Sequence, residues 1–249
     1  MGTVAKAISL LEVLGSGAPE VALADLARQA RFDKATTRRL LMSLIEHGLV
    51  EQNEQSRLYR LGAGIARLAL MREAQFPFLR AAMPTIEALA ADTGETVHIS
   101  EYSSRGLVSL HAVESSRANR VSVPVGELLP LHATASGIAF LAFAESGVRE
   151  RALAGPFEAF TPHTVTSSLA LAALIYDART RGYSIGAQGF EDGVTSVAAP
   201  ILAADQLAIG ALAIAAPKAR IQDGDIEQYG AAAMEAARAI GGRLTVRRA

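Results

Sequence analysis

Apolar residues near the start of the chain recur three or four positions apart, which is the spacing of helices buried on one face. They predict three consecutive helices, at about residues 4–14, 23–30 and 34–47. Glycines and a proline between the first two helices end the first one, and Arg31-Phe32-Asp33 separates the second from the third. Asp33 is placed to cap the third helix, because its carboxylate can accept hydrogen bonds from N–H groups of the first turn.

The third of these helices has two unlike faces. One face is mostly apolar and is formed by Thr37, Leu40, Leu41, Leu44 and Gly48. The opposite face is formed by Ala35, Arg39, Met42, Ser43 and Glu46, with Thr36 and Arg38 on its flanks. A helix that docks on two others by an apolar stripe, and leaves polar groups free, suits the major groove of DNA.

We predict that the N-terminal half of this helix contacts DNA. Arg can pair bidentately with guanine, and a helix N-terminus favours phosphate. The candidate contacts are Lys34, Thr36, Arg38 and Arg39. Taken alone, the arginine pair fits a solvated helix face better, but the order of helix, break and helix favours a recognition helix.

A polar hairpin follows this helix. Residues 48–51 predict a strand, residues 53–56 a turn, and residues 58–61 the returning strand. The hairpin completes a winged helix-turn-helix, in which Arg57 and Arg60 are candidate phosphate contacts that position the module without reading sequence. A helix at about residues 65–73 comes next and is broken at Phe76-Pro77-Phe78. We therefore expect a DNA-binding domain over residues 1–62, a linker helix over 63–80 and a second domain over 81–249.

The second domain alternates between helical and strand-like runs. Helices are predicted at residues 84–92, 136–144, 169–180 and 223–244. Strands are predicted at residues 96–102, 107–113, 120–125, 194–201 and 207–215. Helices that flank a set of short strands indicate an α+β fold with an antiparallel sheet.

Composition narrows the choice of function. The chain of 249 residues has no Cys, which excludes disulfides and Cys-ligated zinc. The net charge of -1 hides an uneven distribution, because residues 1–80 hold 11 Lys+Arg against 8 Asp+Glu, whereas the remainder is acidic. A basic N-terminal part suits a polyanion such as DNA, although chance variation among solvated faces explains the charge equally well. We expect a cytoplasmic protein, since no apolar run could span a bilayer and no secretory signal begins the chain.

Several motifs, taken together and in order, resemble the IclR family of bacterial transcription regulators. They are Lys34–Leu41, Gly94–Val97, Leu129–Gly137, Arg181–Ser184, Glu191–Val194 and Val197–Ile201. The matches run from about Val4 to Arg243 and so cover nearly the whole chain. The resemblance implies a winged helix-turn-helix followed by a GAF-like ligand-binding domain. It also implies a homodimer or homotetramer that binds double-stranded operator DNA under the control of a small organic effector.

The resemblance also implies where the effector binds. The family's pocket, carried over position by position, would be lined by Thr134, Ala135, Ser136, Gly186, Ser196, Ala213 and Ala215. Thr134 leads into a helix N-terminus, where a carboxylate could bind. Relatives that bind small oxoacids carry an acid near Gly186, a Cys near Ser196 and Ser at the positions of Ala213 and Ala215. This barer lining predicts a larger or less polar effector, such as an aromatic or medium-chain acid, unless the two alanines only pack in a core.

Other chemistry finds weaker support. His98, His111, His132 and His163 have spacings that fit no metal motif, so we expect neither a metal nor a cofactor. Ser136 lacks the G-x-S-x-G elbow of hydrolases. An enzyme using Ser136, His132 and Glu191, or an adaptor whose winged helix binds a protein, are the alternatives to a ligand-responsive regulator. Neither accounts for the ordered motifs, so we expect no catalytic residues.

Overall fold

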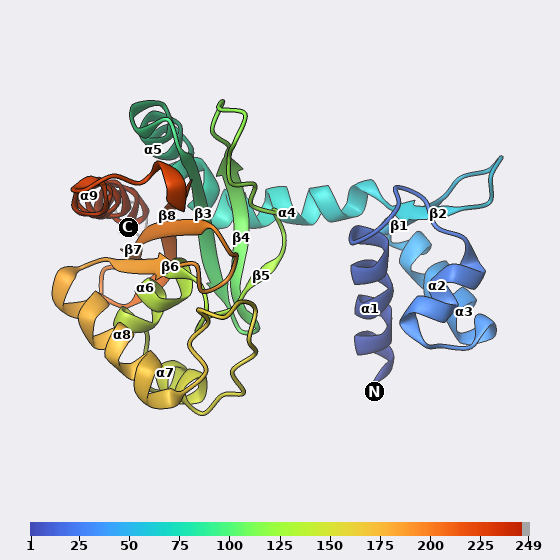
Figure 1. Ribbon diagram of the computed structural model, residues 1–249. Coiled ribbons are helices and arrows are strands. Elements are labelled where there is room, and N and C mark those ends of the chain that lie inside the picture. Colours follow the sequence, from blue (N-terminus) through green and yellow to red (C-terminus); the bar gives the residue numbers. More distant parts are fainter. Residues whose placement is uncertain (246–249) are drawn as a thin grey trace. The chain divides into compact units, whose positions relative to one another are not determined.

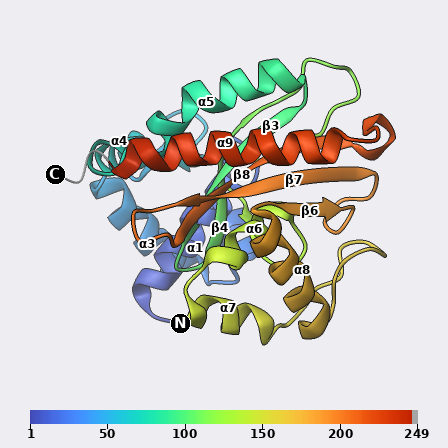
Figure 2. The ribbon, with the colours of Figure 1, turned by 90° about the vertical axis from the view of Figure 1, so that its left-hand side faces the viewer.

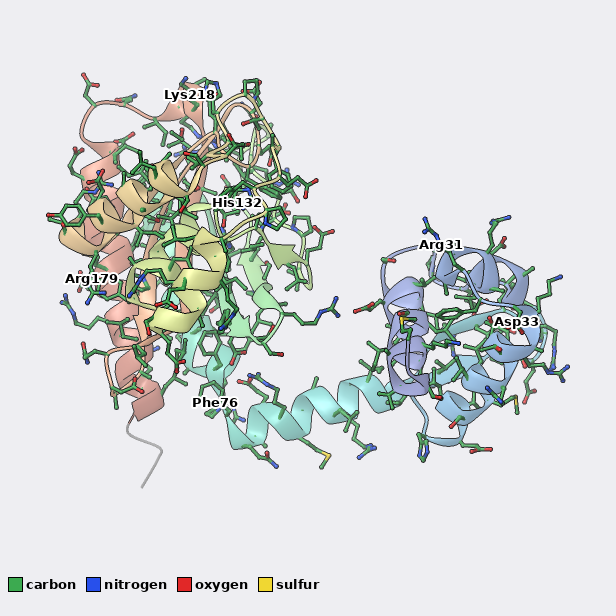
Figure 3. The ribbon with its side chains drawn as sticks, turned by 90° about the horizontal axis from the view of Figure 1, so that it is seen from below. Arg31, Asp33, Phe76, His132, Arg179 and Lys218 are labelled. Atoms are coloured by element: carbon green, nitrogen blue, oxygen red, sulfur yellow. The ribbon has the colours of Figure 1, made fainter. Side chains whose placement is uncertain are left out.

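The structure is a computed structural model that describes residues 1–245. The chain divides into two compact units, Met1–Phe76 and Pro77–Ala249, and each is described by itself. Phe76, labelled in Figure 3, is the last residue of the first unit. This boundary falls inside the segment 63–80 that the sequence assigns to a linker.

The first unit is a three-helix module with a hairpin and a further helix (Figure 1). Its elements are α1 (Thr3–Gly15), α2 (Leu23–Ala30), α3 (Lys34–Glu46), β1 (Val50–Gln52), β2 (Tyr59–Leu61) and α4 (Ala63–Gln75). The predicted helices and hairpin are confirmed to within two residues at each end. Val21 forms an isolated antiparallel bridge to Tyr59, which joins the segment before α2 to the hairpin.

The core of this unit comes from the apolar stripes that the sequence pattern marks. It contains Leu10, Leu14, Val21, Leu26, Leu40, Leu41, Leu44, Val50 and Tyr59. Thr37 is fully buried among the residues of the inner face of α3, as expected. Each of these leucines removes apolar surface from water, and together they fix α3 against α1 and α2.

The second unit is a six-stranded antiparallel sheet in the order β5-β4-β3-β8-β7-β6. The strands are β3 (Thr96–Ser103), β4 (Gly106–Val113), β5 (Leu128–Leu129), β6 (Ser184–Ala187), β7 (Val194–Leu202) and β8 (Ala208–Pro217). The helices are α5 (Phe78–Thr93), α6 (Ala135–Phe143), α7 (Ser146–Leu153), α8 (Ser168–Arg181), the short 3-10 helix η1 (Lys218–Arg220) and α9 (Asp225–Thr245). Helices α5 and α9 lie together on one face of the sheet, and α6 and α8 lie on the other (Figure 2). The predicted α+β class is confirmed.

Two predicted elements of this unit are wrong. Residues 120–125 form no strand, because the Val121 carbonyl accepts a hydrogen bond from the Thr96 side chain, 2.7 Å away, and Pro124 has no N–H to donate to a ladder. Helix α5 begins at Phe78 and contains Pro84 within it. Its buried stripe includes residues on both sides of the proline, and this packing outweighs the lost backbone hydrogen bond. The sequence pattern also fails to predict α7, β5 and β6.

Candidate DNA-recognition surface and ligand cavity

Helix α3 presents its predicted outer face to solvent. Lys34, Arg38 and Arg39 are exposed, whereas Thr36 is half-buried. The exposed face forms a shallow groove lined by Ala35, Arg38, Arg39, Met42, Ser43 and Glu46. The two arginines are therefore exposed and stand beside small and flexible side chains.

The start of α3 is fixed by its predicted cap. The Asp33 carboxylate accepts a hydrogen bond from the Thr36 backbone N–H over 2.7 Å, and the Thr37 hydroxyl donates to the Asp33 carbonyl over 2.9 Å. The Thr36 N–H holds the pKa of Asp33 below its usual range. This cap orients the first turn, which carries the first of the proposed contacts, Lys34.

The two arginines of the wing differ in their surroundings. Arg60 donates to Glu51 over 3.0 Å and lies 3.6 Å from a carboxylate oxygen of Glu20. Hydrogen bonding from Arg60 holds the pKa of Glu51 below its usual range. Arg57 is exposed, and within residues 1–245 its side chain has no ion-pair or hydrogen-bond partner. A phosphate would have to compete with two carboxylates for Arg60 but could approach Arg57 freely.

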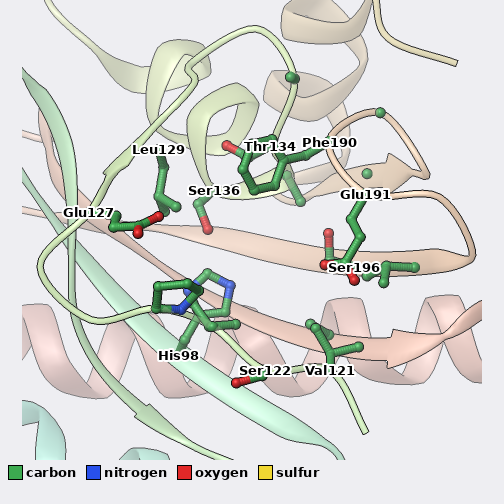
Figure 4. A pocket seen from close by; sticks show the side chains of 18 residues that line it. His98, Val121, Ser122, Glu127, Leu129, Thr134, Ser136, Phe190, Glu191 and Ser196 are labelled. Carbon is green, nitrogen blue, oxygen red and sulfur yellow. The ribbon is translucent and has the colours of Figure 1, made fainter. Parts of the chain in front are cut away.

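The second unit contains a cavity of about 240 Å³ between the N-terminus of α6 and the sheet. Six of the seven expected residues line it: Thr134, Ala135, Ser136, Gly186, Ser196 and Ala215 (Figure 4). Ala213 does not, because it is fully buried in a cluster with Ala135, Ala139 and Ala198. Helix α6 covers β8 at this point, so the cavity ends at the neighbouring Ser196–Ala215 pair.

Two local features set the shape of this cavity. The Thr134 hydroxyl caps α6 by accepting from the Gly137 N–H over 3.0 Å, which fixes the first turn at the cavity wall. Gly186 leaves space that any side chain would fill, since a Cβ there would lie 2.7 Å from the Ser196 hydroxyl oxygen. The bare backbone at Gly186 therefore keeps the cavity open beside the end of the helix.

A loop of residues 114–126, here called the covering loop, forms another wall. Four of its residues line the cavity: Val121, Ser122, Val123 and Pro124. Glu95, which is 1% exposed, anchors this loop by accepting from Arg117 over 2.7 Å and from Arg220 over 2.6 and 2.8 Å. The anchor ties the loop to the segment between β8 and α9.

Several residues that line the cavity were not predicted from the sequence as effector contacts, and His98 is the most informative of them. It lies on β3, is 7% exposed, and its Nδ1 has no hydrogen-bond partner within the described residues. Burial lowers its pKa to about 4, so the ring is neutral at pH 7. The alternation of Thr96, His98 and Ser100 along one face of a strand is the signal that could have placed it.

Two further features of the cavity are an unpaired hydroxyl and a group of aromatic rings. The Ser136 hydroxyl is buried and unpaired within residues 1–245. Phe190 lines the cavity and contacts Phe160 edge-on, with 5.1 Å between the ring centroids. The ring centroids of Phe160 and His132 are 5.9 Å apart. An apolar and aromatic border therefore surrounds a small number of free polar groups, which is typical of a small-molecule site.

Comparison with known protein families accounts for both the helical module and the cavity domain. Residues 3–54 match the model of the IclR helix-turn-helix domain. Residues 74–241 match the model described as bacterial transcriptional regulator IclR C-terminal. The chain belongs to the IclR family of bacterial transcriptional regulators.

Relatives of this IclR-family chain match over almost their full length. It is 28% identical over 244 residues to the HTH-type transcriptional regulator XynR of Escherichia coli, covering 96% of this chain and 97% of XynR. It is 40% identical to an IclR-type regulator of Silicibacter sp. TM1040, with a TM-score of 0.86 and coverage of 98% and 96%. An IclR homolog from Microbacterium hydrocarbonoxydans, solved with 4-hydroxybenzoate, is 26% identical, with a TM-score of 0.85 and coverage of 98% and 99%.

The family assignment decides among the functional classes left open by the sequence. The relatives are named as transcriptional regulators, so the expectation of a DNA-binding regulator rather than an enzyme is confirmed. His132 is engaged with the Glu158 carbonyl at 2.8 Å. Within the described part of the chain, no three His, Cys, Asp or Glu side chains are grouped to hold a metal ion. Across that same part, no helix combines the length and the apolarity needed to cross a membrane.

Proposed function

We propose that this IclR-family regulator binds operator DNA in the cytoplasm as a homodimer or homotetramer, and that a small aromatic or otherwise weakly polar acid in its cavity alters that binding. The observation that supports the effector class is the cavity itself: about 240 Å³, mostly apolar, and bordered by the N-terminus of α6. The segment 63–80 would link the DNA-binding and effector domains.

The DNA contacts divide into two groups. Lys34, Thr36, Arg38 and Arg39 on α3 would enter the major groove, where exposed guanidinium groups can read base edges. Arg57 on the wing would bind phosphate, and Arg60 would do so only by exchanging its carboxylate partners. One such helix reads only a few base pairs, so two copies related by a dyad would be needed for a full operator.

The acid end of the effector follows from the chemistry of α6. The first N–H groups of a helix have no partner within the helix, and the helix dipole favours a negative charge there. The unpaired Ser136 hydroxyl lies in the same turn and can donate to a carboxylate. The Thr134 hydroxyl already caps the helix, so Ser136 is the hydroxyl of this turn that remains for the ligand.

The weakly polar body of the effector follows from the apolar side chains among the other lining residues. Val121, Leu129, Phe190, Val194 and Ala215 offer only apolar surface. A small polar oxoacid would leave its other oxygens unpaired there, at a cost of about 1–3 kcal/mol for each buried group. A cavity of about 150 Å³ suffices for benzene, so this one has room for a ring and its substituents. The complex of the Microbacterium relative makes 4-hydroxybenzoate a suitable first probe.

Calorimetry on the full chain tests the effector class directly. We expect benzoate and 4-hydroxybenzoate to bind more tightly than glyoxylate, and to change retardation of DNA from upstream of the gene. Gly186→Ala should weaken benzoate binding by about tenfold or more, because the new Cβ would crowd the Ser196 hydroxyl. Gly242→Ala on α9 is the matched control, since a Cβ there meets nothing within 4 Å. Preferential binding of glyoxylate would contradict the weakly polar class.

A further inference from the structure

The charged groups at the cavity are of one sign. Glu127, in the loop before β5, and Glu191, in the loop between β6 and β7, both line it. Neither Lys nor Arg is found among the described lining residues. Both glutamates are exposed, and within residues 1–245 neither side chain has an ion-pair or hydrogen-bond partner. Their side chains reach the cavity from opposite sides (Figure 4).

This arrangement favours an effector that also carries a positive charge over one that carries only negative charge. A carboxylate at the N-terminus of α6 would share one cavity with two carboxylates that have no cationic partner among the described residues, and like charges repel. A protonated amine on the same molecule would remove the conflict. An ammonium group offers three donors and no acceptor, whereas an ionised carboxylate only accepts, so the two are complementary.

We infer that the effector is a zwitterion, whose carboxylate binds at Ser136 and the start of α6 and whose ammonium group binds Glu127, Glu191 or both. The inference deepens the proposed function and rests on it. The Ser136 hydroxyl gives independent support, because it is 1% exposed, has no partner within the described residues and points across the cavity toward His98 (Figure 4). A buried hydroxyl without a partner indicates a group supplied from outside the chain.

The space between the charged ends favours an aromatic body. Val121, Leu129 and Phe190 form apolar walls, and Phe190 already makes an edge-on contact with Phe160 at 5.1 Å. A ligand ring against Phe190 would extend this aromatic packing. The ligand class is therefore an aromatic amino acid or a benzoate that carries an aminoalkyl group.

Two pairs of acids, each differing mainly in one charged nitrogen, test the inference by calorimetry on the full chain at pH 7. The pairs are 4-ethylbenzoate with 4-(aminomethyl)benzoate, and 3-phenylpropionate with phenylalanine. We expect the ammonium-bearing acid to bind about tenfold more tightly in at least one pair, as hydrogen bonds between charged groups allow. Equal or tighter binding of the members that lack the ammonium group, in both pairs, would overturn the zwitterion and leave the aromatic acid in place.

Substitutions then locate the group that recognises the amine. The double variant Glu127→Gln with Glu191→Gln keeps the side-chain shape and should abolish the preference within each pair. Asp192→Asn removes the same charge from the adjacent residue, which does not line the cavity, and should leave the preference intact. A preference that survives in the double variant would overturn the assignment to these glutamates. Binding of none of the four acids would overturn the aromatic-acid effector together with the zwitterion.

Discussion

The DNA-recognition surface and the ligand cavity are built in opposite ways. The exposed face of α3 comes from 13 consecutive residues, held by an apolar stripe on the other side of the same helix. The cavity draws on residues from His98 to Ala215, and many of its walls are buried. If the proposed contacts are right, substitutions that weaken DNA binding should hardly change the stability of the fold, whereas many substitutions that weaken effector binding should also change stability.

The largest expected effect is on the stability of the effector unit. Arg220→Ala leaves the buried Glu95 carboxylate with Arg117 alone and removes hydrogen bonds of 2.6 and 2.8 Å. We expect the free energy of unfolding of the effector unit to fall by about 2–4 kcal/mol, because a buried charge loses half of its partners. Chemical denaturation of the full chain would measure the change.

The control for this substitution is an exposed ion pair within the covering loop. Arg120→Ala removes an ion pair with Glu114, in which nitrogen and oxygen lie 2.7 Å apart and both side chains are open to solvent. Exposed pairs contribute little, so the denaturation curve should hardly move. Equal destabilisation by the two substitutions would show that the Glu95 anchor has no special role in holding the covering loop.

The second prediction concerns the pH dependence of stability and centres on His98. Burial lowers its pKa from 6.5 to about 4, so the unfolded chain takes up a proton first as the pH falls. The resulting stability is present above pH 6.5 and is lost as the pH falls toward 4, by roughly 3 kcal/mol at most. His98→Gln should flatten this part of the stability curve. Identical slopes for both proteins between pH 6.5 and 4 would contradict the prediction.

The same contrast explains what could be read from the sequence. Helix α3 and its cap at Asp33 depend on contacts between residues close in the chain, so periodicity and residue type predict them. The strand expected at residues 120–125 is absent because Thr96, a distant residue, takes the Val121 carbonyl. Proline at position 84 signals a helix start by local rules, but packing of α5 on the sheet overrides that signal.

The site shows the same division between local and distant information. Resemblance to the family placed the lining residues at the start of α6, because those residues form one motif. The resemblance also implied Ala213 as a lining residue, but Ala135 and Ala139 of α6 pack over it and exclude it from the cavity. Glu127 and Glu191 were not predicted as ligand contacts, since only the folded chain brings these two loops to one cavity.

The smallest effects on stability are expected from substitutions at the proposed DNA contacts. Arg39 is exposed, and Ala is a good helix former, so Arg39→Ala should leave the unfolding curve unchanged. If Arg39 pairs with a base, specific operator binding should weaken by about 1–3 kcal/mol, while binding to unrelated duplexes changes little. Gel-shift titrations with operator and scrambled DNA would separate the two. An equal loss on both sequences would assign Arg39 to the phosphate backbone.

Arg57→Gln is the counterpart that completes this test. A phosphate contact carries no sequence information, so its loss should weaken operator and scrambled DNA alike. Each phosphate contact also releases counterions, and the slope of log affinity against log salt should therefore become shallower by about one. An unchanged salt slope would remove the wing arginine from the interface. If Arg39 alters specificity and Arg57 only the salt slope, with both variants as stable as the parent, then recognition of DNA is separable from folding at α3 and at the wing.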